Sequence, residues 1–131
     1  MAGETGNAGF GVGIAAESLV RALKARNANR VVLVSEPNAE RAIGGSIAAA
    51  LKRAKITVVP ITLESGESAK QLTVIDEAAR RLAAAGVERG DLLVAVGGGA
   101  LSDTAGLLAA LYLRGIDWVA VPTTLAAQLD A

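Results

Sequence analysis

Four short apolar runs constrain the fold of this 131-residue chain more than any other feature of its sequence. They cover residues 31–34, 56–63, 92–96 and 117–121. Residues 31–34 form an unbroken apolar run, which is typical of a parallel strand that helices cover on both faces. Stretches with helical periodicity alternate with the four runs, the longest at residues 68–85. The alternation predicts an α/β fold, in which a doubly wound parallel sheet lies between two helical layers and the crossovers are right-handed.

The first residues of the chain carry no such period. Residues 1–9 are rich in Gly, Ala, Thr and Asn, and we expect them to form a flexible leader before a single domain at residues 10–131. Residues 10–14 could add a short strand, although three alternating glycines weaken it. A helix is expected at residues 39–54, where two consecutive glycines predict a late start or a kink.

The helix after the third apolar run has recognisable ends. Ser102 or Asp103 can cap its first turn, because hydroxyl and carboxylate oxygens accept hydrogen bonds from free backbone N–H groups there. The helix should run to about Leu113, and Gly115 should end it. Arg114 then lies near the negative end of the helix dipole, a placement that needs no further function.

Composition excludes several classes of function. The chain is 52% hydrophobic but only 2% aromatic, so its core must be aliphatic. It has no Cys and no His, which excludes disulfides, thiolate catalysis, a histidine metal site and an imidazole base. Thirteen basic residues balance thirteen acidic ones, which argues against nucleic acid and anionic membranes as partners. No apolar run approaches the roughly 18 residues of a membrane span, and no signal peptide is evident, so we expect a soluble cytoplasmic protein.

Two segments could bind a nucleotide. The third apolar run ends in Gly97-Gly98-Gly99, and the first is followed by Glu36 and Asn38. In the common strand order these runs are neighbours, and their carboxyl ends flank the crevice where doubly wound sheets bind ligands. Consecutive glycines let the backbone approach a pyrophosphate, and the helix that follows directs free N–H groups at it. A tight turn without a ligand is the alternative, and three glycines favour phosphate binding.

A second glycine pattern, Gly11-x-Gly13-x-x-Ala16, matches the dinucleotide-binding fingerprint. Glu36 follows about 20 residues later, where the fingerprint has a ribose-binding acid. The fingerprint requires a preceding hydrophobic strand, however, and residues 1–9 cannot supply one. We therefore expect the nucleotide at the later glycines.

Two further polar segments have both a structural and a binding interpretation. In residues 65–70 a serine can cap the following helix, or Glu67 and Lys70 can contact a nucleotide; the capping interpretation is favoured. Residues 122–124 (Pro-Thr-Thr) likewise can cap a helix or bind a ligand. Asp103 presents the same two alternatives, which the residues alone leave open.

Taken together, these motifs resemble the 3-dehydroquinate synthase family. The likeness is most specific in residues 97–131, which contain GGGALSD, YLRG and VPTTLAAQLDA. Residues 35–38 and 65–70 fall where that family has its Asp-x-Asn and Gly-Glu-x-x-Lys signatures, and residues 10–14 look like its early aromatic-x-Val-x-Ile strand. The resemblance covers nearly the whole chain.

The resemblance implies a Rossmann-like domain that binds NAD. The residues that it implies contact the cofactor are Glu36, Asn38, Ser65, Gly66, Glu67, Lys70, Gly98, Gly99, Ala100, Leu101, Ser102, Asp103, Thr123 and Thr124. It also places Asp130 near the nicotinamide and substrate, and associates Arg114 with the substrate phosphate. Glu36 stands where the family usually has Asp, which lengthens the ribose acceptor, and Ser102 stands in place of a usual Gly.

The family enzyme is a lyase of the shikimate pathway and is longer than this chain. Its second, helical domain supplies a Glu and two His ligands for zinc, together with substrate-binding Lys and Arg residues. With bound NAD it transiently oxidises 3-deoxy-arabino-heptulosonate 7-phosphate, eliminates phosphate, reduces the product and cyclises it. Because this chain has no His, the resemblance implies an NAD-binding half that lacks the metal and is inactive without the C-terminal helical domain.

Two alternatives and one consequence accompany this interpretation. The glycerol and iron-type alcohol dehydrogenases share a Gly-Gly-Gly…Asp loop and Pro-Thr-Thr, although YLRG and QLD argue against them. A ligand-free engineered α/β scaffold is the other alternative. A domain separated from a larger protein exposes apolar surface, so we expect self-association, with a dimer favoured.

Overall fold

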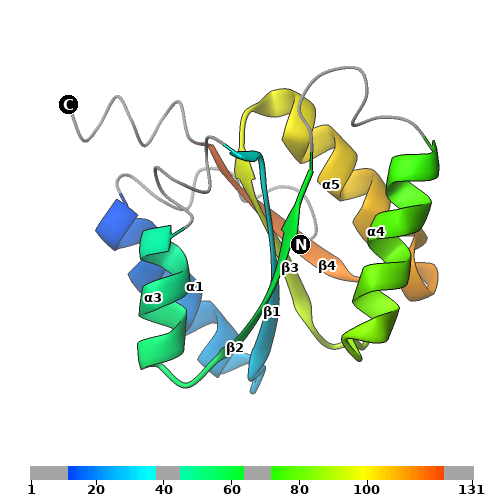
Figure 1. Cartoon of the computed structure of the whole chain (residues 1–131). Coiled ribbons are helices and arrows are strands. Elements are labelled where there is room, and N and C mark those ends of the chain that lie inside the picture. Colours follow the sequence, from blue (N-terminus) through cyan, green and yellow to red (C-terminus); the bar gives the residue numbers. More distant parts are fainter. Residues whose placement is uncertain (1–11, 38–44, 64–71, 123–131) are drawn as a thin grey trace.

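The computed structural model describes residues 12–37, 45–63 and 72–122 (Figure 1). Its elements, in chain order, are α1 (Val12–Ala25), β1 (Arg30–Ser35), α3 (Gly45–Arg53), β2 (Thr57–Thr62), α4 (Leu72–Ala84), β3 (Leu92–Gly97), α5 (Gly99–Leu111), the 3-10 helix η3 (Tyr112–Arg114) and β4 (Asp117–Pro122). The four apolar runs are the four strands, which confirms the predicted alternation of strands and helices.

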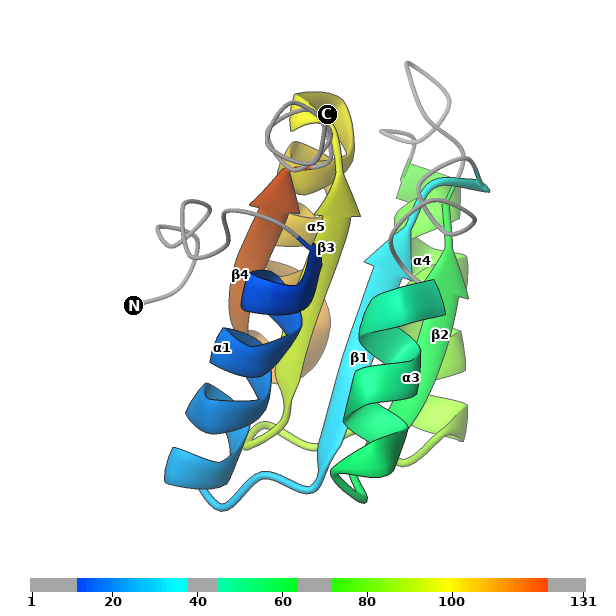
Figure 2. The same ribbon diagram turned by 90° about the vertical axis from the view of Figure 1, so that its left-hand side faces the viewer.

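The strands form one parallel sheet in the order β2-β1-β3-β4. Figure 2 shows α1 and α3 on one face of this sheet, and α4 and α5 on the other. The chain therefore moves outward from β1 to β2 through α3, and then from β3 to β4 through α5 on the opposite face. The predicted α/β fold with a doubly wound parallel sheet and two helical layers is confirmed.

The central strands β1 and β3 separate two aliphatic cores. Val31 and Leu33 pack toward α1 and α3, whereas Val32 and Val34 pack toward α4 and α5. Every residue of β3 is buried, as expected of a strand covered on both faces. Each fully buried aliphatic side chain contributes on the order of 2 kcal/mol, so aliphatic residues supply most of the free energy that holds the layers together. Tyr112 is the buried aromatic residue of the described part of the chain.

Two sequence predictions about element ends are wrong. Residues 10–14 could have formed a short strand weakened by glycines, but α1 begins at Val12, so the described residues of that segment are helical. The segment is followed directly by the helix formers Ala15, Ala16 and Glu17, and it joins their helix. Ser102 and Asp103 lie inside α5 and do not cap it, because the helix begins three residues earlier, with Gly98 at its N-cap.

The C-terminal end of α5 lies close to its predicted position at about Leu113. The helix ends at Leu111, and the chain reverses through η3, in which Leu113 has φ 50°. Arg114 and Gly115 also have positive φ, of 68° and 113°. Glycine favours this backbone region, so Gly115 completes the turn into β4. No helix in the described ranges combines the length and apolar character needed to span a bilayer.

Candidate nucleotide-binding site

The candidate site lies where β1 and β3 end side by side. In their register Ser35 faces Val96, so both strands reach the carboxyl edge of the sheet together. The helices that follow them leave toward opposite faces, and at such a point a doubly wound sheet is expected to have a ligand-binding crevice; we call this edge between β1 and β3 the crevice. The predicted adjacency of Glu36 and the glycine loop is confirmed.

A hydrogen bond joins the two sides of this crevice. The backbone N–H of Gly98 donates to Glu36 Oε1 at 3.2 Å, across 62 residues of sequence. Glu36 is half-buried, and Ser35 just before it is 3% exposed, so the strand end is firmly positioned. The side chain of Glu36 is one methylene longer than that of Asp, and its carboxylate lies against the glycine loop.

The three glycines of the loop differ in their surroundings. A Cβ atom on Gly97 would lie 2.5 Å from Leu101 Cδ2 and 2.8 Å from Glu36 Oε1, so no side chain fits there. A Cβ on Gly98 or Gly99 would meet no atom within 4 Å. Gly97 therefore permits Glu36 to approach the loop, whereas Gly98 and Gly99 leave open space in which a ligand can reach the backbone.

The loop leads directly into the N-terminus of α5. No side chain caps Gly98, and the first-turn N–H groups at Gly99, Ala100 and Leu101 have no acceptor within an α-helix. Together with the positive end of the helix dipole, such groups bind anions. Leu101 is fully buried and fixes this turn against the core, so its backbone, and not its side chain, is available to a ligand.

The side chains that follow Leu101 differ in how far they are buried. Ser102 is half-buried and Asp103 is exposed, one turn further from the strand end. Thr104 is buried, and its hydroxyl donates to the carbonyl oxygen of Ala100 at 3.0 Å, which fixes the first turn. Sequence reasoning did not single out Thr104; its position three residues after the buried Leu101 was the available signal.

The remaining predicted site residues are distributed differently. Arg114 lies beyond the far end of α5, about 20 Å of helix away from the glycine loop. Within one chain, the structure does not bring it to the crevice. Gly13 lies in the first turn of α1, and Gly11, the first glycine of the fingerprint match, lies outside the described ranges. The other residues lie outside the described ranges: Asn38, Ser65, Gly66, Glu67, Lys70, Thr123, Thr124 and Asp130.

A second polar cluster lies at the opposite, amino edge of the sheet, and sequence analysis did not anticipate it. Arg30 Nε donates to Asp91 Oδ2 at 2.8 Å, and this oxygen also accepts from the Glu88 N–H at 2.8 Å. Asp91 is 7% exposed. The cluster is closed by pairing among its own members, which is the arrangement of a structural tie.

Tyr112 and Arg26 extend this tie. The Tyr112 hydroxyl donates to the carbonyl oxygen of Val87 at 2.7 Å in a buried site. Burial raises the pKa of Tyr112 above 10.0; the positive charge of Arg30 opposes this shift, and the negative charge of Asp91 adds to it. Arg26 donates to Asp117 at 3.0 Å and to the carbonyl oxygen of Gly90 at 3.1 Å. The amino edge therefore joins the starts of β1, β3 and β4.

A family model and curated relatives that match this sequence carry the same description. The family model described as 3-dehydroquinate synthase N-terminal matches residues 60–131, more than half of the chain. The chain belongs to the 3-dehydroquinate synthase family. It is similar to the 3-dehydroquinate synthase of Caulobacter vibrioides (strain NA1000 / CB15N), with 46% identity over 102 residues. That match covers 78% of this chain but 28% of the relative, so the chain spans less than a third of the length of this relative.

Solved structures agree with this family assignment. The chain is similar to ValA, the 2-epi-5-epi-valiolone synthase from Streptomyces hygroscopicus subsp. jinggangensis 5008, solved with NAD+ and Zn2+ bound. The two are 29% identical with a TM-score of 0.66, over 76% of this chain and 28% of ValA. An iron-containing alcohol dehydrogenase from Corynebacterium glutamicum ATCC 13032 KITASATO has a TM-score of 0.63 at 20% identity, over 93% of this chain and 29% of the dehydrogenase. This second likeness shows a shared fold alone, and the family match decides between the two predicted relationships.

Proposed function

We propose that this chain binds NAD at the crevice between β1 and β3, as the nucleotide-binding domain of a 3-dehydroquinate synthase-type protein. The observation that carries the proposal is the loop at Gly97, where a missing side chain lets Glu36 contact the Gly98 N–H at the end of β3. The solved structure of ValA with NAD+, on a similar fold, supports the choice of cofactor.

The residues of the crevice fit two parts of a dinucleotide, the pyrophosphate and a ribose. The N–H groups at Gly99, Ala100 and Leu101 would donate to the pyrophosphate, and the open space at Gly98 and Gly99 lets it approach. The Glu36 carboxylate would accept from a ribose hydroxyl. Bound there, NAD would supply a hydride acceptor for transient oxidation of an alcohol.

Further contacts and activity are proposed on the family resemblance. Asn38, Ser65, Gly66, Glu67, Lys70, Ser102, Asp103, Thr123 and Thr124 would complete the cofactor site, and Asp130 would lie near the nicotinamide. We propose that phosphate elimination and cyclisation of 3-deoxy-arabino-heptulosonate 7-phosphate also require a C-terminal helical domain, and that this chain is inactive without it. The basis is that the chain spans 28% of its relative from C. vibrioides.

The described residues do not fit a divalent metal. Within the described ranges, no group of three or more His, Cys, Asp or Glu side chains lies close enough to hold one, and the whole chain has no His. The zinc in the ValA structure therefore has no counterpart among the described residues, and the proposed function of this chain is limited to binding and orienting NAD.

A homo-oligomer, most simply a dimer, is also proposed. The observation that supports it is exposed apolar surface on α5, where Leu107 is 41% exposed and Leu111 is 58% exposed. This part of the proposal does not depend on NAD, and sedimentation of the chain over a range of concentrations tests it.

An NMR titration of the chain with NAD tests the cofactor proposal. We expect the amide signals of Glu36 and of Gly98 to Ser102 to shift together and to saturate, since these groups surround the crevice. The amides of Gly90 and Gly115, at the amino edge, serve as the internal control and should remain in place. Shifts that avoid the glycine loop, or none at millimolar NAD, would contradict the proposal and leave a ligand-free α/β fold.

A further inference from the structure

The two helical layers differ in charge, although the chain as a whole is neutral. Helices α1 and α3 together carry four cations and one anion. Helices α4 and α5, on the other face of the sheet, carry two cations and three anions. A surface on which one sign of charge dominates raises the local concentration of ligands of the opposite sign. Of the two described layers, the one formed by α1 and α3 therefore attracts anions.

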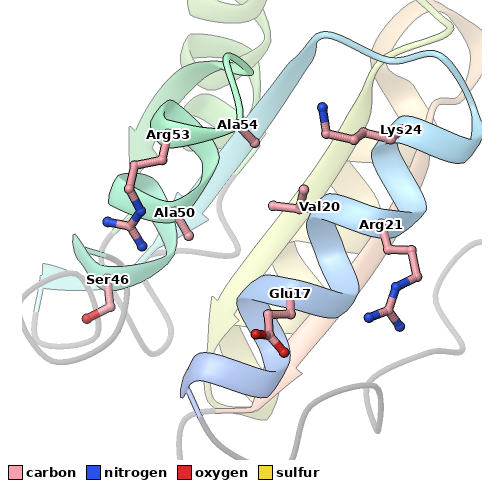
Figure 3. Close-up of a pocket in the computed structure, with 8 residues that line it drawn as sticks. All are labelled: Glu17, Val20, Arg21, Lys24, Ser46, Ala50, Arg53 and Ala54. Atoms are coloured by element: carbon pink, nitrogen blue, oxygen red, sulfur yellow. The ribbon is translucent and has the colours of Figure 1, made fainter.

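A groove between α1 and α3 gathers this charge (Figure 3). The α1–α3 groove, as we call it, has a volume of about 770 Å³, within the range of roughly 300–1,000 Å³ found for small-molecule sites. Its charged lining residues are Glu17, Arg21, Lys24 and Arg53, all of them exposed. The half-buried side chains of Val20 and Ala50 point into the space between the two helices and form an apolar wall.

The cations of the α1–α3 groove have no carboxylate partner among the described residues. The ion pairs recorded between described residues do not include Arg21, Lys24 or Arg53. Arg21 follows Glu17 by four positions, the spacing at which opposite charges meet on a helix, yet these two side chains do not pair. Figure 3 shows Lys24 reaching from α1 toward α3. The described part of the chain thus leaves this positive charge for an anion to neutralise.

The other helical layer shows the opposite arrangement. On α4, Arg80 lies 3.0 Å from Asp76, and Arg81 lies 3.6 Å from Glu77. A smaller hollow of about 210 Å³ beside α4 is lined by this second pair, so its own residues balance its charge. The same fold therefore pairs exposed cations on α4 and leaves those of the α1–α3 groove without a described partner.

Helix dipoles explain part of the positive charge, but not its placement around one groove. Lys24 and Arg53 lie in the last turns of α1 and α3, where a cation stabilises the negative end of a helix. Both helices run toward the amino edge of the sheet, because each precedes the start of a parallel strand. Their two last turns consequently lie at the same end of the groove, and Arg21 adds a third cation one turn earlier.

We propose that the α1–α3 groove binds a small molecule that ends in a diphosphate group. The phosphates lie between Lys24 and Arg53, since ammonium and guanidinium groups both donate to phosphate oxygens. The organic part lies on the apolar wall of Val20 and Ala50. Glu17, toward the other end of the groove, repels phosphate and accepts from hydroxyl groups of the organic part.

The dimensions of the groove favour a small molecule over a protein segment. Its α1 side extends from Glu17 to Lys24, seven positions or roughly 10 Å of helix. An extended chain crosses that distance in about three residues, which is short for specific recognition. The groove shares no lining residue with the glycine loop, and the two phosphates of NAD are both esterified and lack the additional charge of a terminal phosphate. We therefore distinguish this ligand from the cofactor of the crevice.

An NMR titration of the chain with adenosine diphosphate tests the groove. We expect the amide signals of Lys24, Ala50 and Arg53 to shift together and to saturate. Phosphate that binds at the glycine loop instead shifts Gly98 to Leu101, so the two sites are observed separately. Shifts confined to the glycine loop, or no shifts at millimolar adenosine diphosphate, would overturn the proposal.

Removal of single charges tests the position of the phosphates. Lys24→Gln and Arg53→Gln should each raise the dissociation constant measured from the groove amides about fivefold, because each removes one cationic donor. Arg80→Gln is the matched control: it removes a 79% exposed cation from α4, and the constant should stay within about twofold. Circular dichroism checks that all three variants fold. Unchanged binding in both groove variants would overturn the placement of the phosphates.

Inorganic pyrophosphate tests the contact with the apolar wall. It supplies the phosphates without an organic part, so it should bind the groove about fivefold more weakly than adenosine diphosphate. Equal affinities would overturn the contact of the organic part with Val20 and Ala50. None of these outcomes bears on NAD, whose binding is measured at Glu36 and Gly98 to Ser102, so the failure of one proposal is distinguishable from the failure of the other.

Discussion

The two edges of the sheet are held together in different ways. At the amino edge, side chains join segments far apart in sequence: Arg30 to Asp91, Tyr112 to Val87 and Arg26 to Asp117. At the carboxyl edge, the structure records between described residues one long-range side-chain hydrogen bond, from Gly98 to Glu36. The other features of the carboxyl edge are Gly97, Gly98 and Gly99 and the start of α5, which no side chain caps.

This difference separates stability from binding. A buried group that is already paired in the folded chain cannot bind a ligand without losing its partner, and this describes Asp91 and Tyr112. Glu36 is half-buried and pairs with the Gly98 N–H through Oε1, and its carboxylate has a second oxygen for a ligand. Backbone N–H groups at the start of α5 have no helical acceptor and become useful when an anion arrives. We therefore expect substitutions at the amino edge to lower the free energy of unfolding, and substitutions at the carboxyl edge to alter the binding of NAD.

The largest effect is expected from Asp91→Ala. The change leaves the half-buried Arg30 with only its longer contact to the exposed Glu88 carboxylate, at 3.8 Å, and leaves the Glu88 N–H without its acceptor, so the free energy of unfolding should fall by about 3 kcal/mol. Urea unfolding followed by the fluorescence of Trp118, the one tryptophan of the chain, measures it. NAD affinity of the folded fraction should not change.

Asp76→Ala is the matched control for that experiment. It removes the same carboxylate from an ion pair of similar length, 3.0 Å, whose side chains are 79% and 64% exposed. Exposed pairs contribute less than about 1 kcal/mol, so the two variants should differ clearly. Equal losses would show that the amino edge is not the stabilising edge.

Gly97→Ala should have the next largest effect and should act on both properties. The new methyl group would overlap Leu101 and Glu36 Oε1, so we expect about 2 kcal/mol of destabilisation from overpacking. Displacing Glu36 should also weaken NAD binding by about tenfold, measured by calorimetry. Gly90→Ala, where a Cβ meets no atom within 4 Å, should change neither quantity appreciably. Unaltered NAD binding in Gly97→Ala would separate the loop from the proposed site.

Tyr112→Phe isolates one hydrogen bond of the amino edge. Without the hydroxyl, the buried carbonyl of Val87 loses its donor, which should cost about 1.5 kcal/mol at neutral pH. The contribution is present in full below pH 10.0 and falls as pH rises through the elevated pKa of the folded state, because the unfolded chain loses the proton first.

The alkaline part of this prediction has a direct readout. Tyr112 is the one tyrosine of the chain, so the absorbance of tyrosinate reports its titration in the folded and the urea-unfolded state. The folded transition should lie at the higher pH. Stability curves of the original chain and Tyr112→Phe should approach each other above pH 10.0; curves that remain parallel there would contradict the assigned shift.

The sequence predicted the carboxyl edge better than the amino edge, for a physical reason. Strand order and the adjacency of Glu36 to the glycine loop follow from apolar runs and from rules of parallel sheets, which local patterns express. The pairs at the amino edge join residues 61 and 91 positions apart, and no local pattern marks Arg30 or Asp117 as partners.

The two wrong predictions concern where helices begin, and in each the neighbouring residues favour a different start. Residues Val12–Ile14 alternate like a strand, but the adjoining helix formers extended α1 through them. Ser102 and Asp103 are good capping residues, yet α5 starts at Gly99 because Leu101 and Thr104 bury against the core from its first turn. In both cases the residues next to the predicted boundary decided the structure.

The smallest effect on stability is expected from Glu36→Gln, and it gives the sharpest test of the comparison. The amide oxygen can still accept from the Gly98 N–H, so the free energy of unfolding should change by less than about 0.5 kcal/mol. The negative charge is lost, however, and a carboxylate accepts from a hydroxyl more strongly than an amide does, so NAD affinity should fall by about tenfold. Calorimetric titration with NAD measures the affinity, and urea unfolding of the same sample measures the stability. A large loss of stability with unchanged affinity would make Glu36 a structural tie like Asp91, and the two edges would then no longer divide stability from binding.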